Sequence, residues 1–405
     1  MKKRVVITGM GSVTPYGISN EQFFESLVRG VNAVKCISKF DTTRFRSKKS
    51  GEITELNVYP IFKSNSILRI PFLSKLALVS SHFTTKDARI APKKLKPYEI
   101  GIFIGSEGSY FLQGKIWDMI VQEMIDEVRP LDFQEVVVNA PASHISINQK
   151  IKGPCFAFAE GLNALYTAVC FLTNRKIKYC LVGAVDEYVR VHHEAYSYLN
   201  VLSPNDGGQE ECRPFDKHRN GVIFSEGGAF LNIEYLDQAC RRNCTIHGEI
   251  LAVSMQSDGY KVGDNDPEGT GFELAMKKAI KQAHIGVDEI DWIVAAAPGT
   301  VNIDKGESKA INRVFGVNSY IPPVTSIKSC LGLLKCTGGI LNIIAGLCAF
   351  KENVIPPTTH YETADPECDL DCVPNHSRKK EVNTILINSF LWGGIYNSVI
   401  IRKYV

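Results

Sequence analysis

The sequence predicts an α/β protein built from two similar halves. Short uncharged apolar runs of strand length alternate with longer stretches in which apolar residues recur every three to four positions. The order of strand, glycine turn and helix occurs once before residues 245–250 and begins again after them. Alternating strands and helices favour a mainly parallel sheet covered by helices on both faces. We therefore expect an internal duplication, with residues 1–247 and 248–405 as its halves.

Strands are expected where a short apolar run carries few or no charges. The expected strands are Val5–Thr8, Ile100–Ile104, Cys155–Ala159, Tyr179–Val182, Ala229–Ile233, Ile250–Ser254, Trp292–Ala296, Pro323–Ile327, Thr384–Asn388 and Ser398–Ile401. We expect a tight turn at residues 9–12 after the first of them, and Gly183 is expected to end the fourth.

Helices are expected where the apolar residues recur at the period of an α-helix. The expected helices are Gln22–Arg29, Leu76–Ala88, Leu112–Met124, a helix that begins at Gly161, Gly271–His284, Lys305–Val314 and one around Gly338-Gly339.

Residues 153–164 are expected to organise the functional site. Gly153-Pro154 introduces the apolar run Cys155–Ala159, which reads as a buried strand, and a helix begins at Gly161. The free N–H groups and the dipole of a helix N-terminus can lower the pKa of a thiol and hold an oxyanion. A strand–helix elbow of this kind can therefore carry a nucleophile, but its sequence offers none at the helix start.

Composition is ordinary for a soluble globular protein and excludes some classes of function. Of the 405 residues, 44% are hydrophobic and 22% are charged, and the formal net charge is +3. A charge this small does not indicate nucleic-acid binding. The 12 cysteines include no C-x-x-C pair, which favours reduced thiols in a cytoplasmic protein.

We expect no metal, cofactor or membrane segment. Cys240, Cys244 and His247 could supply three metal ligands, but no fourth ligand stands close in sequence. The apolar run after Lys2-Lys3-Arg4 is too short for a signal peptide, and no window approaches the ~18 apolar residues of a spanning helix.

Several motifs in this order resemble the β-ketoacyl-ACP synthase family, which has the thiolase fold. The matching segments are Arg4–Gly11, Gly153-Pro154, Arg213–Lys217 with Gly221, Glu226-Gly227, Val354–Thr358 with Asp369–Asp371, and Asn388–Phe390 before Gly393-Gly394. The resemblance covers essentially the whole chain. It implies two duplicated βαβαβ-type halves in five layers, α-β-α-β-α.

Enzymes of this family use a Cys nucleophile and two His residues, and the matched positions here carry neither. Counting back from the helix start places the Cys position on Phe158, and counting forward from Gly153-Pro154 places it on Leu162. We favour Phe158, because the elbow is about four residues short and the helix start is the firmer anchor. The two His positions fall on Pro298 and Leu333, while Trp392 occupies the gate position in the turn near the C-terminus.

The resemblance implies a chain-length factor, the β-type ketosynthase subunit of a type II polyketide synthase. Such a chain is expected to have no enzymatic activity alone, to pair with a catalytic ketosynthase as a heterodimer, and to meet the acyl carrier protein through that complex. An aromatic polyketide is favoured over an aryl polyene. Two alternatives stay open: an active acyltransferase that uses Cys155 or Cys330, and a scaffold for carrier proteins.

The helix that begins near Tyr110 is expected to close the partner's acyl tunnel. The residues expected to line the pocket or interface, together with Trp392, are Tyr110, Phe111, Leu112, Ile116 and Trp117. Leu112 and Ile116 are one turn apart and could equally be core. The basic residues Arg44, Arg46, Lys48, Lys49, Lys93, Lys94 and Lys96 could face an acidic carrier, although a solvated surface is the favoured interpretation.

Overall fold

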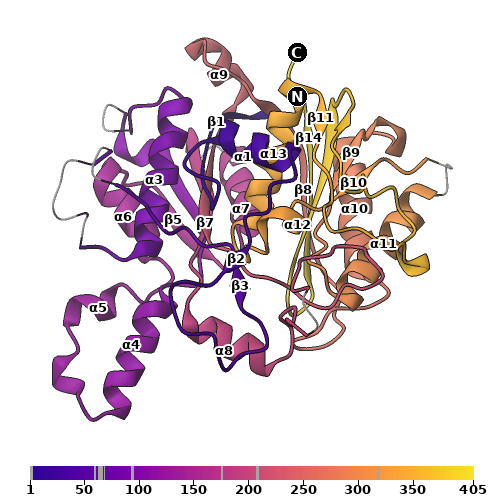
Figure 1. Ribbon diagram of the computed structural model, residues 1–405. Coiled ribbons are helices and arrows are strands. Elements are labelled where there is room, and N and C mark those ends of the chain that lie inside the picture. Colours follow the sequence, from indigo (N-terminus) through magenta and orange to yellow (C-terminus); the bar gives the residue numbers. More distant parts are fainter. Residues whose placement is uncertain are drawn as a thin grey trace.

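Ten strands form one hydrogen-bonded sheet in the order β10-β9-β13-β14-β8-β1-β7-β6-β4-β5 (Figure 1). The computed structural model describes residues 3–58, 61, 62, 67, 69–92, 95–174, 177–206, 209–316 and 320–405. The strands of the sheet are β1 (Val5–Val13), β4 (Ile100–Gly105), β5 (Cys155–Phe158), β6 (Tyr179–Asp186), β7 (Gly227–Tyr235), β8 (Gly248–Ser257), β9 (Trp292–Val294), β10 (Val324–Thr325), β13 (Thr384–Leu391) and β14 (Ile395–Arg402). Two-residue strands form small separate ladders: β2 (Lys35–Cys36) with β3 (Lys49–Ser50), and β11 (Val354–Ile355) with β12 (Arg378–Lys379).

The prediction of a mainly parallel sheet is wrong, because the sheet is mixed. Only β4–β5, β4–β6, β9–β10 and β9–β13 are parallel pairs, while the pairs along the middle of the sheet are antiparallel. A tight turn joins β13 to β14, where Gly393 and Gly394 have positive φ. A short turn returns the chain antiparallel, whereas a parallel pair needs a long crossover. Hydrophobic period alone does not distinguish these connections.

Helices cover the sheet in layers, and one layer lies between its two halves (Figure 1). α3 (Phe72–Asp87) and α6 (Ala140–Gln149) pack beside β1, β7 and β4, and α10 (Thr270–Ala283) and α11 (Val301–Phe315) pack on the other outer face. Between them, α7 (Gly161–Thr173) contacts β8 of the second half, and α13 (Gly338–Glu352) contacts β7 of the first. The five expected layers are therefore present. The exact boundary between residues 247 and 248 stays a prediction.

Three buried clusters correspond to these layers. The central cluster joins α7 and α13 to strands of both halves, and it includes Leu165, Ile343 and Ile387. A second cluster lies under α10 and α11, and a third lies under α3. The remaining helices are α1 (Asn20–Val28), α4 (Tyr110–Val121), α5 (Pro130–Gln134), α8 (Arg190–Tyr198), α9 (Leu236–Arg242) and α12 (Lys328–Leu331).

Residues 9–12, expected as a turn, lie within β1. The strand continues to Val13 and pairs with β7 along its whole length. A Cβ on Gly9 would lie 2.5 Å from the Thr84 carbonyl oxygen, and one on Gly11 would lie 2.6 Å from the Ser80 carbonyl oxygen. These glycines therefore permit close approach of α3 to the strand. Gly183 likewise lies inside β6, where a Cβ would meet Phe230, and does not end the strand.

β5, expected to be buried, is an exposed edge of the sheet. It pairs only with β4 among the described residues, and Cys155 and Phe156 are exposed. Elsewhere on the same half of the protein, α4 and α5 form an arm that projects from the body (Figure 1). No helix within the described residues is long and apolar enough to cross a membrane.

Candidate functional site

The strand–helix elbow forms where the sequence predicts it. Ala159 and Glu160 join the last residue of β5, Phe158, to the first residue of α7, Gly161. The Gly161 N–H donates to the Cys336 carbonyl oxygen at 2.9 Å, which ties the elbow to the loop before α13. Because β4, β5 and β6 are parallel, their carboxyl ends meet at this edge, where α/β proteins commonly place their sites.

The free N–H groups at the start of α7, which could bind an oxyanion, are instead bonded to the carboxyl group of Glu160. Its Oε2 accepts from Leu162 N at 2.8 Å and Asn163 N at 3.1 Å. Ser389 Oγ donates to Oε1 at 2.9 Å, and Asn397 Nδ2 donates to Oε2 at 3.2 Å. Burial raises the pKa of Glu160 to about 8, against the opposing effect of the hydrogen bonds. Glu is not among the residues usually preferred at a helix N-cap, so the sequence did not signal this role.

The residues that the sequence analysis assigns to the family's catalytic positions are apolar, and the structure places them in different clusters; the assignment itself stays a prediction. Phe158 packs against the central core, to which Leu162 belongs. Leu333 and Trp392 meet instead around Phe224. The Trp392 ring centroid lies 5.9 Å from that of Phe224. The structure therefore joins the second His position to the gate position.

The Pro298 position sits in a loop held by buried carboxyl groups. Asp304 accepts from the N–H groups of Gly299 and Thr300, each at 3.2 Å. Glu307 accepts from Ala296 N at 2.9 Å and from Ala297 N at 2.7 Å. Burial raises the pKa of Asp304 to about 7 and also raises that of Glu307. These carboxyl groups fix the backbone on both sides of Pro298.

Glu226 and Lys328, the charged residues kept from the family pattern, make structural contacts. Glu226 accepts from Ile53 N at 2.6 Å and pairs with Lys39. Lys328 Nζ donates to the Ala295 carbonyl oxygen at 3.3 Å, and burial lowers its pKa. Both residues hold loops at the rim of the site.

A charged cluster that the sequence analysis missed lies close to Leu333. Lys335 forms an ion pair with Glu107 and donates to the Tyr196 hydroxyl at 3.3 Å. Its ammonium nitrogen lies 5.7, 5.4 and 5.9 Å from the ring centroids of Tyr110, Tyr196 and Phe224. Burial lowers the pKa of Lys335, but the carboxylate of Glu107 outweighs it and the pKa is raised. Because 228 positions separate the two charges in the chain, no sequence pattern pairs them.

Neither cysteine considered as an alternative nucleophile is activated. Cys155 lies at the start of β5, six residues before α7, and burial raises its pKa. Cys330 is buried in α12, and burial raises its pKa as well. Raised pKa values leave these side chains as thiols, which are weaker nucleophiles than thiolates.

Some of the expected interface residues on α4 are buried against the protein, and others are exposed to solvent. Leu112 and Ile116 are buried, as the core interpretation anticipated. Phe111 and Trp117 are 59% and 65% exposed. Tyr110 is half-buried and its ring packs at a tilt against His192, with ring centroids 4.3 Å apart.

A large open cavity lies between this arm and the body of the protein. Its volume is about 1100 Å³, and Phe111 and Leu112 form part of its wall. Arg69 and Lys75 also line it, and neither forms an ion pair with the described residues. The cavity therefore combines apolar walls with charged residues of both signs, of which Arg69 and Lys75 are basic residues without an ion-pair partner among the described residues.

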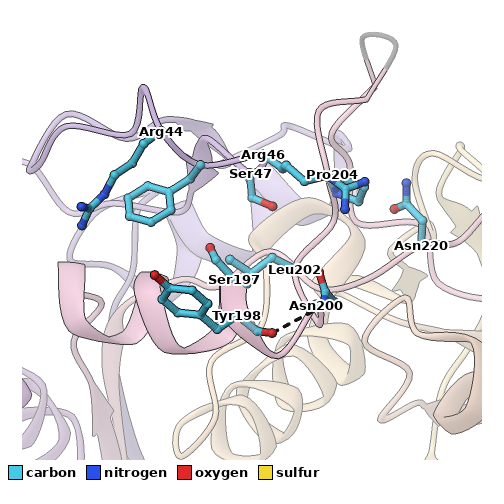
Figure 2. Close-up of a pocket in the computed structure, with 10 residues that line it drawn as sticks. Arg44, Arg46, Ser47, Ser197, Tyr198, Asn200, Leu202, Pro204 and Asn220 are labelled. Atoms are coloured by element: carbon cyan, nitrogen blue, oxygen red, sulfur yellow. Dashed lines mark hydrogen bonds between the residues drawn. The ribbon is translucent and has the colours of Figure 1, made fainter.

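A second pocket, of about 440 Å³, lies between the loop at residues 44–47 and the end of α8 (Figure 2). Arg44 pairs with Glu194, and Arg46 pairs with Asp206. These pairs fit the solvated-surface interpretation of the two arginines. Lys93 and Lys94 lie outside the described residues.

The described residues contain no group of three or more His, Cys, Asp or Glu side chains placed to hold a metal ion. The three ligands considered from the sequence have other partners. Cys240 Sγ lies 3.9 Å from the Tyr404 hydroxyl, and His247 Nε2 lies 2.8 Å from Asp87 Oδ2.

Curated relatives align with the chain from end to end. A 3-oxoacyl-[acyl-carrier-protein] synthase 2 from Coxiella burnetii is 28% identical over 99% of this chain and 99% of its own length. A protein of the same name from Staphylococcus aureus is 30% identical over 99% of this chain and 98% of its own. These names correct the expectation that the chain is not an enzyme on its own, because whole-length relatives are named as synthases.

Solved structures and family profiles agree with the fold. The structure titled "The ishigamide ketosynthase/chain length factor" superposes with a TM-score of 0.93 at 23% identity, over 100% of both chains. Residues 2–239 match the profile of the beta-ketoacyl synthase N-terminal domain, and residues 247–362 match that of the C-terminal domain. The two profiles span most of the chain, which therefore belongs to the beta-ketoacyl synthase family.

Proposed function

We propose that the chain is one of two ketosynthase-fold subunits of an acyl-condensing complex of the type II polyketide kind. In this complex it acts as a chain-length factor, with α4 closing the far end of an acyl chamber formed with a catalytic ketosynthase. The observation that carries the proposal is the apolar arm of α4 and α5, which the chain leaves uncovered on the same half as an unpaired sheet edge.

The arm exposes more apolar surface than a monomer normally does. Ten large apolar residues in and around α4 and α5 are between 36% and 80% exposed. They are Phe111, Trp117, Ile120, Val121, Met124, Ile125, Leu131, Phe133, Val137 and Val138. Contiguous apolar surface of this kind marks a protein–protein interface.

The edge of the sheet supports the same partner surface. β5 consists of Cys155, Phe156, Ala157 and Phe158, with no charge and no proline. Natural proteins usually protect an exposed edge strand with charged residues or proline. An uncharged edge on the same half as an uncovered arm favours a partner that pairs along β5 and covers α4.

The apolar residues at the family's catalytic positions support a role in shaping the chamber. Apolar side chains occupy space where the family's catalytic residues are expected, namely Phe158, Leu162, Pro298 and Leu333. Trp392 adds a large ring at the gate position. A chamber wall selects chain length by steric exclusion, because overpacking costs about 1–3 kcal/mol. A difference of that size shifts a product ratio by roughly tenfold.

The names of the relatives favour acyl condensation on a carrier protein as the reaction of the complex. An acidic carrier is supported by Arg69 and Lys75, whose charges face the open cavity without ion-pair partners. A carrier scaffold without influence on chain length is the competing function. A cytoplasmic location accompanies either proposal.

The test is product length from the assembled complex. We expect Phe111→Ala, with the complex intact, to lengthen the product by one or more ketide units. Leu112→Ala should do the same but also destabilise the chain by roughly 2–5 kcal/mol, because Leu112 is buried. Val262→Ala is the control, since Val262 is 98% exposed and lies outside the arm.

Unchanged product length in both chamber variants, with normal assembly, would favour the scaffold function. Recovery of the chain without any ketosynthase partner would contradict the two-subunit proposal. Condensation by the isolated chain is measured in parallel, so that activity within this chain is separated from the effect of pairing.

A further inference from the structure

Two adjacent histidines on α8 differ in how their ring nitrogens are satisfied. His193 Nδ1 lies 2.9 Å from the Tyr188 hydroxyl, and its Nε2 lies 2.9 Å from the Ser47 carbonyl oxygen. His192 is only 6% exposed, yet neither of its ring nitrogens has a hydrogen-bond partner among the described residues. Buried polar groups are nearly always hydrogen-bonded, so His192 lacks a partner that its site should contain.

The surroundings of His192 show where that partner would bind. Its Nε2 lies 3.9 Å from Glu107 Oε2, which is too far for a direct hydrogen bond. Polar atoms separated by more than about 3.5 Å are often joined by a water molecule.

A small cavity lies beside the ring. Its volume is about 10 Å³, and its walls include Glu107, Tyr110, Glu187 and His192. A cavity of roughly 10–15 Å³ accommodates one water, which needs two to four polar partners. The carboxyl groups and the imidazole supply them, while neighbouring Leu73 and Val185 close the space.

We infer that this cavity is a binding site for one ordered water molecule, which hydrogen-bonds to a ring nitrogen of His192 and to the carboxylate of Glu107. A neutral ligand fits the site best, because the Lys335 ammonium disfavours a second cation and the two glutamates disfavour an anion. Burial and then Lys335 lower the pKa of His192 to about 3. The neutral ring has one donor and one acceptor, and water can pair with either.

The test is a crystal structure of the full chain, with its partner if the two co-purify, at a resolution that shows internal waters. We expect a density peak within hydrogen-bonding distance of a His192 ring nitrogen and of Glu107. The peak should disappear in His192→Phe, which keeps an aromatic ring without nitrogens, and persist in His192→Gln. His193 serves as the internal control, because protein atoms already satisfy both of its nitrogens.

Nitrogen NMR of the histidine rings gives a second readout that does not depend on the variants. We expect a neutral His192 ring with one protonated nitrogen at pH 5–7. An empty cavity in crystals that show other buried waters would overturn the inference. So would a direct hydrogen bond between His192 and either Glu107 or Glu187.

Discussion

At the residue scale, Glu160 connects three elements through one carboxyl group. It caps α7 and accepts from Ser389 on β13 and Asn397 on β14. All four hydrogen bonds are donated to the carboxyl group, yet burial still raises its pKa to about 8 from an ordinary value of 4.5. The folded protein therefore holds a proton on this group more tightly than the unfolded chain does.

This difference predicts a pH dependence of stability. Between pH 4.5 and about 8 the folded state binds more protons at Glu160, so the stability from this group is complete below pH 4.5 and is lost as the pH rises through 8. In Glu160→Gln, the free energy of unfolding should fall less steeply with pH, by up to about 1.4 kcal/mol per pH unit. Urea unfolding of both proteins from pH 5 to 9 measures it. Equal slopes would contradict the raised pKa.

Residual pH dependence should persist in this variant. Burial also raises the pKa of Asp304, to about 7 from 3.8, and this shift acts in the same direction. The free energy of unfolding of the double variant Glu160→Gln/Asp304→Asn should therefore depend less on pH than that of either single variant.

The assignment of residues to the family's catalytic positions stays a prediction, and the sequence does not reveal what surrounds them. Phe158, Pro298 and Leu333 follow from counting along motifs. Lys335 and Glu107 meet only because β4 and the loop before α13 end at the same edge, and a distance of 228 positions hides that contact. Glu160 was not predictable as a cap either, because Glu is not a preferred N-cap residue and its partners Ser389 and Asn397 lie far along the chain.

At the element scale, the contact between β1 and α3 depends on residues without side chains. A Cβ on Gly9 would meet backbone atoms of Thr84 and Ala88 at 2.5 and 2.7 Å. Backbone atoms of a packed helix cannot rotate away as a flexible side chain can, so α3 as a whole would have to move.

Gly9→Ala should therefore destabilise the protein by about 1–3 kcal/mol. The expected result is a lower urea midpoint with an unchanged slope. Gly316→Ala is the matched control, since Gly316 ends α11 with negative φ and a Cβ there meets nothing within 4 Å. A loss of stability in the control as large as in Gly9→Ala would show that the contact with α3 is not the cause.

Element type was easier to predict than element direction or length. α7 begins at Gly161 as expected, and β4 is found within one residue of its expected end. β1 was predicted five residues too short because Gly9 and Gly11 read as a turn. Only the presence of α3 explains those glycines, and that information is not local to the strand.

At the scale of the whole molecule, one edge of the sheet is unprotected. β10 at the other end of the sheet is buried, whereas β5 exposes Phe156. The Phe156 ring also stacks on Phe103 and packs at a tilt against Phe171, with centroids 5.6 and 5.2 Å apart. The edge is therefore rigid and apolar, as a pairing surface requires.

A charge at this edge should block assembly. We expect Phe156→Lys to shift the protein from a complex to a monomer in size-exclusion chromatography with light scattering, because a cation would be desolvated against the partner strand. Val262→Lys, at a residue that is 98% exposed in a loop, should leave assembly unchanged. Normal assembly of Phe156→Lys would place the interface elsewhere.

The position of β1 between β7 and β8 also affects how the chain is made. The neighbours of β1 in the sheet lie at residues 228–235 and 248–250. At about 5–20 residues per second, synthesis reaches them on the order of 10–50 s later. During that delay an uncharged strand has no place in the sheet. Pairing of β1 in the sheet therefore waits until the middle of the chain has been made.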